Sequence, residues 1–269
     1  MAWGNGHLAV AGHSLEYACH GPAPDVAPTL VMLHEGLGSV GLWRDWPAAL
    51  AKATGLGVLA YSRAGYGRSS TISLPRPLDY MTREAEDVLG PVMDAVGVRS
   101  AILLGHSDGA TIAAIYAGSV SDMRVRGLVL LAPHFFVEPS GLAAIADAGR
   151  AFDKGDLRDR LARHHDDPDA AFGGWFGAWT DPGFADWSVA DAIDHWRVPV
   201  LAVQGDADPY GTRAQIDEIA DRIYAPLETL WLNGVGHAPH VERPEKVTEA
   251  VAAFCETLIA METEASPLL

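Results

Sequence analysis

Short, mostly apolar segments alternate with longer segments of helical periodicity along most of this chain. Strands that are apolar along their whole length are buried on both faces, which is typical of parallel sheets covered by helices. An antiparallel hairpin is predicted over residues 7–20, before the first of these segments. The expected strands are 29–33, 57–61, 101–104, 125–131, 198–203 and 228–232, and the expected helices are 43–54, 79–96, 108–118, 212–222 and 244–261. The pattern predicts an α/β fold with a mostly parallel central sheet flanked by helices.

The alternation stops between residues 134 and 196, where the chain is rich in Trp, Phe, Asp and His. This segment leaves the sheet directly after the expected strand 125–131, so it must emerge at the carboxyl ends of the strands. We therefore predict a core formed by residues 1–133 and 197–269, with residues 134–196 inserted as a helical cap. Trp175 and Trp179, in its densest aromatic stretch, are candidate substrate contacts, although core packing within the cap is an equally good interpretation.

Composition excludes several classes of function. The chain has 19 Lys and Arg against 35 Asp and Glu, a net charge of −16, which disfavours binding to a phosphate backbone. Only two cysteines occur, with no Cys/His spacing typical of zinc, so neither a disulfide framework nor a metal is expected. No apolar run is long enough to span a membrane, and the N-terminal residues lack the pattern of a signal peptide. We expect a cytoplasmic protein that binds neither nucleic acid nor membrane, and its oligomeric state is left open.

The segment Gly105-His106-Ser107-Asp108-Gly109 is the strongest functional motif. It is a G-x-S-x-G sequence between an expected strand and an expected helix, the context in which a serine on a sharp turn exposes its hydroxyl as a nucleophile. Outside that context, an ordinary helix N-cap serine would be the simpler interpretation.

A nucleophilic serine requires a histidine base and a carboxylate that orients it. Asp208 follows the expected strand 198–203, and His237 follows the expected strand 228–232. These loops lie at the strand ends where open α/β sheets bind ligands, and the order Ser, Asp, His suits this arrangement. Asp206 and His240 are the nearby alternatives.

With these residues in place, the chain resembles the α/β-hydrolase superfamily of serine hydrolases over nearly its whole length. The resemblance is carried by the segments 34–39, 62–69 and 105–109 and by the loops that contain Asp208 and His237. It implies the catalytic residues Ser107, Asp208 and His237 and no cofactor. It also implies an oxyanion hole formed by the backbone N–H groups of Gly36 and Asp108, with Leu37 as the alternative to Gly36.

Glu35 departs from the His-Gly pair usual in that superfamily, and a solvated or salt-bridged loop residue is the simpler interpretation of it. Gly36 to Gly41 also satisfies G-x-G-x-x-G, but the acidic residue that binds a ribose is missing after the next strand, so a dinucleotide site is not expected. The run from His164 to Asp167 lacks the spacing of a metal site and is expected to be solvated surface.

The sequence therefore predicts a serine hydrolase that cleaves a small or medium carboxylic ester through an acyl-enzyme. Under a second hypothesis the fold is the same, but the protein cleaves a carbon–carbon bond, a lactone or an amide, or acts as a perhydrolase. A third is a non-catalytic ligand receptor, since a fold does not determine a function. The partner expected in the first hypothesis is a small acyl compound.

Overall fold

The computed structural model describes residues 3–265 and contains one eight-stranded sheet in the order β1-β2-β4-β3-β5-β6-β7-β8. β1 and β2 form the predicted antiparallel hairpin, β2 pairs antiparallel with β4, and every other neighbouring pair is parallel. The strands are β1 (Asn5–Val10), β2 (His13–His20), β3 (Thr29–Leu33), β4 (Gly57–Tyr61), β5 (Ala101–His106), β6 (Val125–Leu131), β7 (Val200–Gly205) and β8 (Leu227–Leu232). The predicted α/β sheet is confirmed.

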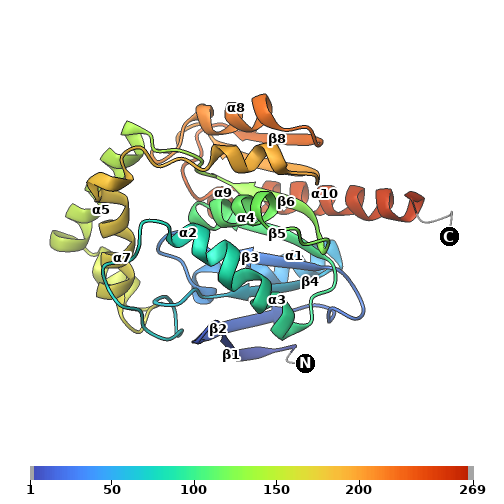
Figure 1. Cartoon of the computed structure of the whole chain (residues 1–269), viewed down its shortest axis with the longest axis horizontal. Helices are drawn as coiled ribbons and strands as arrows, with labels where there is room; N and C mark the ends of the chain where they lie inside the picture. Colours follow the sequence, from blue (N-terminus) through green and yellow to red (C-terminus); the bar gives the residue numbers. More distant parts are fainter. Residues whose placement is uncertain (1–2, 266–269) are drawn as a thin grey trace.

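Helices cover both faces of the sheet (Figure 1). On β3, Val31 and Leu33 pack toward one set of helices, while Leu30 and Met32 pack toward the other. This alternation explains why the strand is apolar at every position from 30 to 33. The first face carries α2 (Tyr80–Arg83), α3 (Gly90–Val96), α4 (Asp108–Ser119) and α8 (Arg213–Arg222), and the second carries α1 (Trp46–Thr54) and α10 (Pro244–Ala265).

The helix predicted over residues 79–96 is interrupted. α2 is followed by a π-helical stretch, η2 (Glu84–Leu89), before α3 begins at Gly90. Pro91 stands at the start of α3 and has no N–H to donate to the preceding turn, which disturbs the regular α-helical hydrogen bonding there. Two short elements were not predicted, η1 (Val40–Trp43) before α1 and α9 (Pro239–Glu242) before α10.

The segment between β6 and β7 is mainly helical. It contains α5 (Pro139–Lys154), α6 (Leu157–Leu161), α7 (Pro168–Thr180), η3 (Pro182–Phe184) and η4 (Ala190–His195). α5 and α7 stand together at the left of the sheet in Figure 1, away from the layers that cover its faces. At the end of the segment Trp196 is fully buried and donates its indole N–H to the Ala114 carbonyl of α4 (2.9 Å). The division into a core and a cap at residues 134 and 196 stays a prediction.

Among the described residues, no helix combines the length and the apolar character needed to cross a membrane. Both cysteines, Cys19 and Cys255, are free thiols, and Cys255 is buried.

Candidate active site

Ser107 occupies a strained turn between β5 and α4. Its φ of 54° and ψ of −120° are rare for a residue with a side chain, and such strain is common where a nucleophile is held between a strand and a helix. The flanking glycines are required by packing. A Cβ on Gly105 would lie 2.2 Å from the Gly109 carbonyl oxygen, and one on Gly109 would lie 2.0 Å from the Leu33 carbonyl oxygen. The G-x-S-x-G spacing therefore allows β3, β5 and α4 to meet closely around the serine.

Asp208 and His237 meet in the loops that follow β7 and β8. His237 Nδ1 lies 2.8 Å from Oδ2 and 3.0 Å from Oδ1 of Asp208. Asp208 also accepts hydrogen bonds from the Tyr210 backbone N–H (2.8 Å) and from the Gln204 amide (2.9 Å). Burial alone would raise the pKa of Asp208, but His237 and these donors hold that pKa below its ordinary value. Asp208 is thus an ionised carboxylate that fixes the orientation of the His237 ring.

The two alternative residues are engaged elsewhere. Asp206 Oδ1 accepts a hydrogen bond from the Gly234 backbone N–H at 2.6 Å. His240 is buried and stacks on Trp46, with ring centroids 4.8 Å apart. Burial lowers the pKa of His240 to about 3, so its ring remains neutral. Of the four residues, the structure brings together Asp208 and His237, the pair predicted from the sequence.

His106, the residue before Ser107, connects the serine turn to the histidine loop. Its Nε2 lies 2.6 Å from the His237 carbonyl oxygen, and its ring centroid lies 5.1 Å from that of His237. On the other side, His106 Nδ1 lies 3.6 Å from Glu35 Oε2. Glu35 is half-buried, and although burial opposes its charge, His106 keeps its pKa below the usual range. The interpretation of Glu35 as a salt-bridged loop residue agrees with this pair.

The loop from His34 to Gly36 directly follows β3, beside the serine turn. The buried guanidinium of Arg63 donates to the carbonyl oxygens of His34 (2.5 Å) and Glu35 (2.9 Å), which holds the backbone path of this loop. Asp108 is the first residue of α4, and N–H groups in a first helical turn have no partner within the helix. The Gly36 and Asp108 N–H groups stay predicted oxyanion donors, with Leu37 as the alternative to Gly36.

The two cap tryptophans chosen from the sequence lie beside these groups. A Cβ on Gly36 would lie 2.2 Å from Trp175 Nε1, so the Trp175 ring packs directly on the loop after β3 that carries the predicted oxyanion donor. Trp179 donates its indole N–H to the Tyr80 hydroxyl (3.1 Å). Both rings are buried and belong to the hydrophobic core as well. The two interpretations drawn from the sequence, core packing and substrate contact, therefore do not exclude each other for Trp175 and Trp179.

Sequence reasoning missed several residues around the site. His165 was expected in solvated surface, but it is buried, and this expectation was wrong. Its Nδ1 accepts a hydrogen bond from the Gly67 N–H, and its Nε2 donates one to the Leu37 carbonyl, both at 2.9 Å. His165 therefore connects the segment 134–196 to the loop after β3. His134 was not predicted as a site residue, yet its ring centroid lies 5.5 Å from that of His237. Its position three residues after the end of β6, at the carboxyl edge of the sheet, was the available signal.

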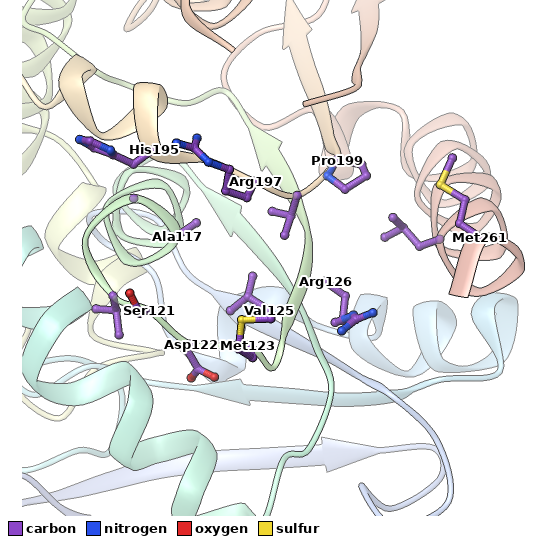
Figure 2. Close-up of a pocket in the computed structure, with 14 residues that line it drawn as sticks. Ala117, Ser121, Asp122, Met123, Val125, Arg126, His195, Arg197, Pro199 and Met261 are labelled. Carbon is purple, nitrogen blue, oxygen red and sulfur yellow. The ribbon is translucent and has the colours of Figure 1, made fainter. Parts of the chain in front are cut away.

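A large hollow lies elsewhere in the described part of the chain. It has a volume of about 680 Å³ and is lined by Val125 at the start of β6, by Pro199 just before β7 and by Ala117 and Gly118 near the end of α4. Figure 2 shows His195, Arg197 and Met261 around it, and none of the candidate catalytic residues. Because it opens at the amino ends of the strands, and ligands of open α/β sheets bind at the carboxyl ends, we do not assign the reaction to it.

Comparison with known proteins agrees with this geometry. Residues 30–250 match the model of the alpha/beta hydrolase family. The chain belongs to that family. Epoxide hydrolase A of Mycobacterium tuberculosis is 27% identical over 85% of this chain and 90% of its own length. The human (lyso)-N-acylphosphatidylethanolamine lipase is 34% identical, but over 40% of this chain and 30% of its own.

Two solved structures of this family resemble the whole fold. The proline iminopeptidase of Mycobacterium smegmatis has a TM-score of 0.73 at 20% identity and covers 94% of this chain and 98% of its own. The enol-lactonase of Burkholderia xenovorans has a TM-score of 0.72 at 23% identity and covers 93% and 99%. Such low identities support the fold alone. The family establishes a hydrolase, and it does not select the bond that is cleaved.

Gly36→Ala is expected to lower kcat on ester substrates by about tenfold or more, because the new methyl group would displace either the loop after β3 or Trp175. Gly41→Ala, five residues further along in η1, is the matched control, since a Cβ there would meet nothing closer than 3.4 Å. The double variant Gly36→Ala/Trp175→Ala should regain part of the lost rate. Steady-state kinetics on one nitrophenyl ester measures all three variants, and an unchanged kcat for Gly36→Ala would remove Gly36 from the predicted oxyanion hole.

His240→Phe is expected to make the protein less sensitive to acid. The pKa of His240 is about 3 in the folded protein and about 6.5 in an unfolded chain. Below pH 6.5 the unfolded state therefore takes up a proton that the folded state refuses, and the free energy of unfolding falls by about 1.4 kcal/mol per pH unit. Phenylalanine keeps the ring against Trp46 and removes this loss. Urea unfolding at pH 7 and pH 5 gives the free energy of unfolding of the variant and of the wild type. The variant's free energy of unfolding relative to that of the wild type should be higher at pH 5 than at pH 7. A pH-independent difference would contradict the prediction.

Proposed function

We propose that this hydrolase cleaves small carboxylic esters through an acyl-enzyme formed on Ser107. The observation that carries the proposal is the buried, ionised Asp208 hydrogen-bonded to His237 at the sheet edge where Ser107 occupies its strained turn. A serine hydroxyl needs such a base to become a nucleophile. The proposal also takes residues 134–196 as a cap that covers this edge and sets substrate choice.

The hydrogen bond to Asp208 assigns the protons of the His237 ring. A carboxylate can only accept, so Nδ1 carries the proton and Nε2 has a free lone pair. Nε2 takes the Ser107 proton as Oγ attacks the substrate carbonyl, and Asp208 stabilises the positive ring that results. The N–H groups of Asp108 and Gly36 receive the negative oxygen of the tetrahedral intermediate.

The second half of the reaction repeats these steps with water. His237 gives its proton to the leaving alcohol, which departs and leaves the acyl group on Ser107. A water molecule then loses a proton to Nε2 and attacks the acyl carbonyl. As the second tetrahedral intermediate collapses, Nε2 returns that proton to Ser107 Oγ, which releases the carboxylic acid and restores the serine hydroxyl. This scheme uses only side-chain and backbone groups.

The small cavity lined by Asp108, the residue after Ser107, supports a small acyl group. It has a volume of about 20 Å³ and lies between Asp108 of the core and Trp175 and Trp179 of the cap. A long acyl chain would require these tryptophans to move. The size of this cavity is the reason to place small esters first among the possible substrates.

A panel of substrates tests the proposal. Nitrophenyl esters of graded acyl length would be run beside lactones, amides and a vinylogous diketone, and mass spectrometry would search for the acyl group on the peptide that contains Ser107. Ester turnover with an acylated Ser107 is the expected result. Turnover of the diketone alone would favour carbon–carbon cleavage, and the absence of turnover and acylation on every compound would favour a ligand receptor.

A further inference from the structure

The small cavity lined by Asp108, Trp175 and Trp179 has an unusual lining. Its approximate volume of 20 Å³ is enough for one water-sized group. The core contributes Asp108, His134 and Tyr210, and the inserted segment contributes Glu138, Trp175 and Trp179. Asp108 directly follows the candidate nucleophile in the sequence. The cavity therefore borders the residue next to the candidate nucleophile.

The Asp108 carboxylate has one oxygen that lacks a partner. Asp108 is 1% exposed, and its Oδ2 accepts a hydrogen bond from the Tyr80 hydroxyl. Within the described residues, Oδ1 is buried and has no hydrogen-bond partner. A buried carboxylate oxygen without a donor is costly, by about 1–3 kcal/mol or more. Because the same residue lines the cavity, a donor that entered the cavity could relieve this cost.

Two arginines influence Asp108 without satisfying Oδ1. Burial raises the pKa of Asp108, while the charges of Arg63 and Arg76 oppose this rise. The Arg63 Nη atoms donate to the carbonyls of His34 and Glu35, and Arg76 Nη2 donates to the Ala64 carbonyl. Their charges offset part of the rise in pKa that burial causes, and their hydrogen bonds leave one Asp108 oxygen without a donor.

The remaining lining favours a small cation over an anion. Trp175, Trp179 and Tyr210 provide aromatic rings, whose faces attract cations. Burial and the neighbouring His237 lower the pKa of His134 to about 3, so its ring is neutral. Glu138 adds a second carboxylate, which accepts hydrogen bonds from Thr212 and Gln215. Among the described residues that line the cavity, none is lysine or arginine.

We propose that this cavity binds the ammonium group of the substrate, with Asp108 as the residue that selects it. The substrate class is then an ester of an α-amino acid, because an ammonium group on the α-carbon lies only two bonds from the scissile carbonyl carbon and fits a cavity of this size. This inference rests on the proposed function of Ser107 and specifies its substrate. The ammonium group is bound and released unchanged, while the ester bond to the leaving alcohol is broken by acyl transfer to Ser107 and then to water.

A matched pair of esters tests the substrate class on the wild-type protein. The benzyl esters of L-alanine and isobutyric acid have nearly the same shape, and an ammonium group in the first replaces a methyl group in the second. Benzyl alcohol release gives kcat/KM for each, and division by the hydroxide-catalysed rate constant of each ester removes their difference in intrinsic reactivity. We expect the corrected ratio to favour the alanyl ester by tenfold or more. A corrected ratio near one would overturn the proposal.

Variants test the role of Asp108. Asp108→Asn should reduce the corrected ratio to within about threefold of one, while Asp206→Asn, the same change in an exposed loop outside the cavity, should leave the ratio as in the wild type. An unchanged ratio in Asp108→Asn would exclude Asp108 as the selecting residue. If that variant does not fold, Trp179→Phe, which keeps a ring in the cavity but loses the hydrogen bond to Tyr80, should reduce the ratio to a smaller extent, and an unchanged ratio there would count against the proposal.

Binding without turnover separates this inference from the proposed function. L-Alaninamide should protect Ser107 from a fluorophosphonate and should raise the melting temperature, whereas isobutyramide should do neither. Labelling of Ser107 without selective protection by L-alaninamide would overturn the ammonium site and leave the serine hydrolase in place. Absence of labelling would overturn the proposed function, and the melting temperatures with the two amides would then decide the ammonium site on their own.

Discussion

Ser107→Ala is expected to lower kcat on any accepted ester by about 10⁴- to 10⁶-fold, because the remaining groups of a triad contribute little without the nucleophile. Alanine can keep the strained turn, because serine already tolerates it with a Cβ, so the fold should be retained. Circular dichroism and the melting temperature check the fold, and steady-state kinetics measures the loss.

Chemical labelling gives the same prediction an independent test. A fluorophosphonate should modify Ser107 in the wild type and nothing in Ser107→Ala, as mapped by peptide mass spectrometry. The control is Ser39→Ala, because Ser39 is a buried serine in the neighbouring loop after β3 and has no part in the proposed chemistry. Modification of any other serine, or more than about 1% residual activity in Ser107→Ala, would remove Ser107 as the nucleophile.

The parts of the fold that were predicted from sequence are those fixed by local pattern. β3 (Thr29–Leu33) and β6 (Val125–Leu131) have the predicted bounds, because Pro28 and Gly36 flank the first apolar run and turn-forming residues flank the second. Asp208 and His237, expected in the loops after β7 and β8, do meet, because parallel strands place their carboxyl ends at one edge whatever the details of packing, and their catalytic roles stay predictions. This is why topology alone was enough to bring together two residues 29 positions apart.

The missed features depend on contacts that no local pattern encodes. His165 lies 128 residues from Leu37, whose carbonyl it binds, and only the path of the inserted segment brings them together. Tyr80 and Asp108 meet because α2 crosses α4, and the helical periodicity of residues 79–96 does not show where the π-helical stretch shifts the register. The free oxygen of Asp108 follows from this packing. Sequence analysis considered Asp108 only for its backbone N–H, since an aspartate at the start of a helix is ordinarily a favourable first-turn residue.

His237→Ala should be as damaging as the loss of the nucleophile, by about 10⁴-fold or more in kcat, because Ser107 would then have no base. Asp208→Asn should cost about 10³- to 10⁴-fold, since an amide nitrogen facing Nδ1 would favour the ring tautomer with its proton on Nε2, where the lone pair is needed. Kinetics on one ester at pH 8 measures both effects, and the melting temperature shows whether the fold survives the change at the buried Asp208.

His240→Phe and Asp206→Asn are the matched controls, one for each residue type: Asp206 lies in the same loop as Asp208, and His240 lies in α9, three residues after His237. His240 is stacked on Trp46 with its pKa near 3, and Asp206 accepts a backbone N–H, so neither faces the reacting atoms. Both controls should keep kcat within about threefold of the wild type, which is a far smaller change than the loss expected of a triad residue. His240 also packs against His106, with ring centroids 4.8 Å apart, and His106 binds the His237 carbonyl. A moderate loss of kcat in His240→Phe would therefore be explained by a shift in the position of His237. An inactive His240→Phe together with an active His237→Ala would instead assign the role of base to His240.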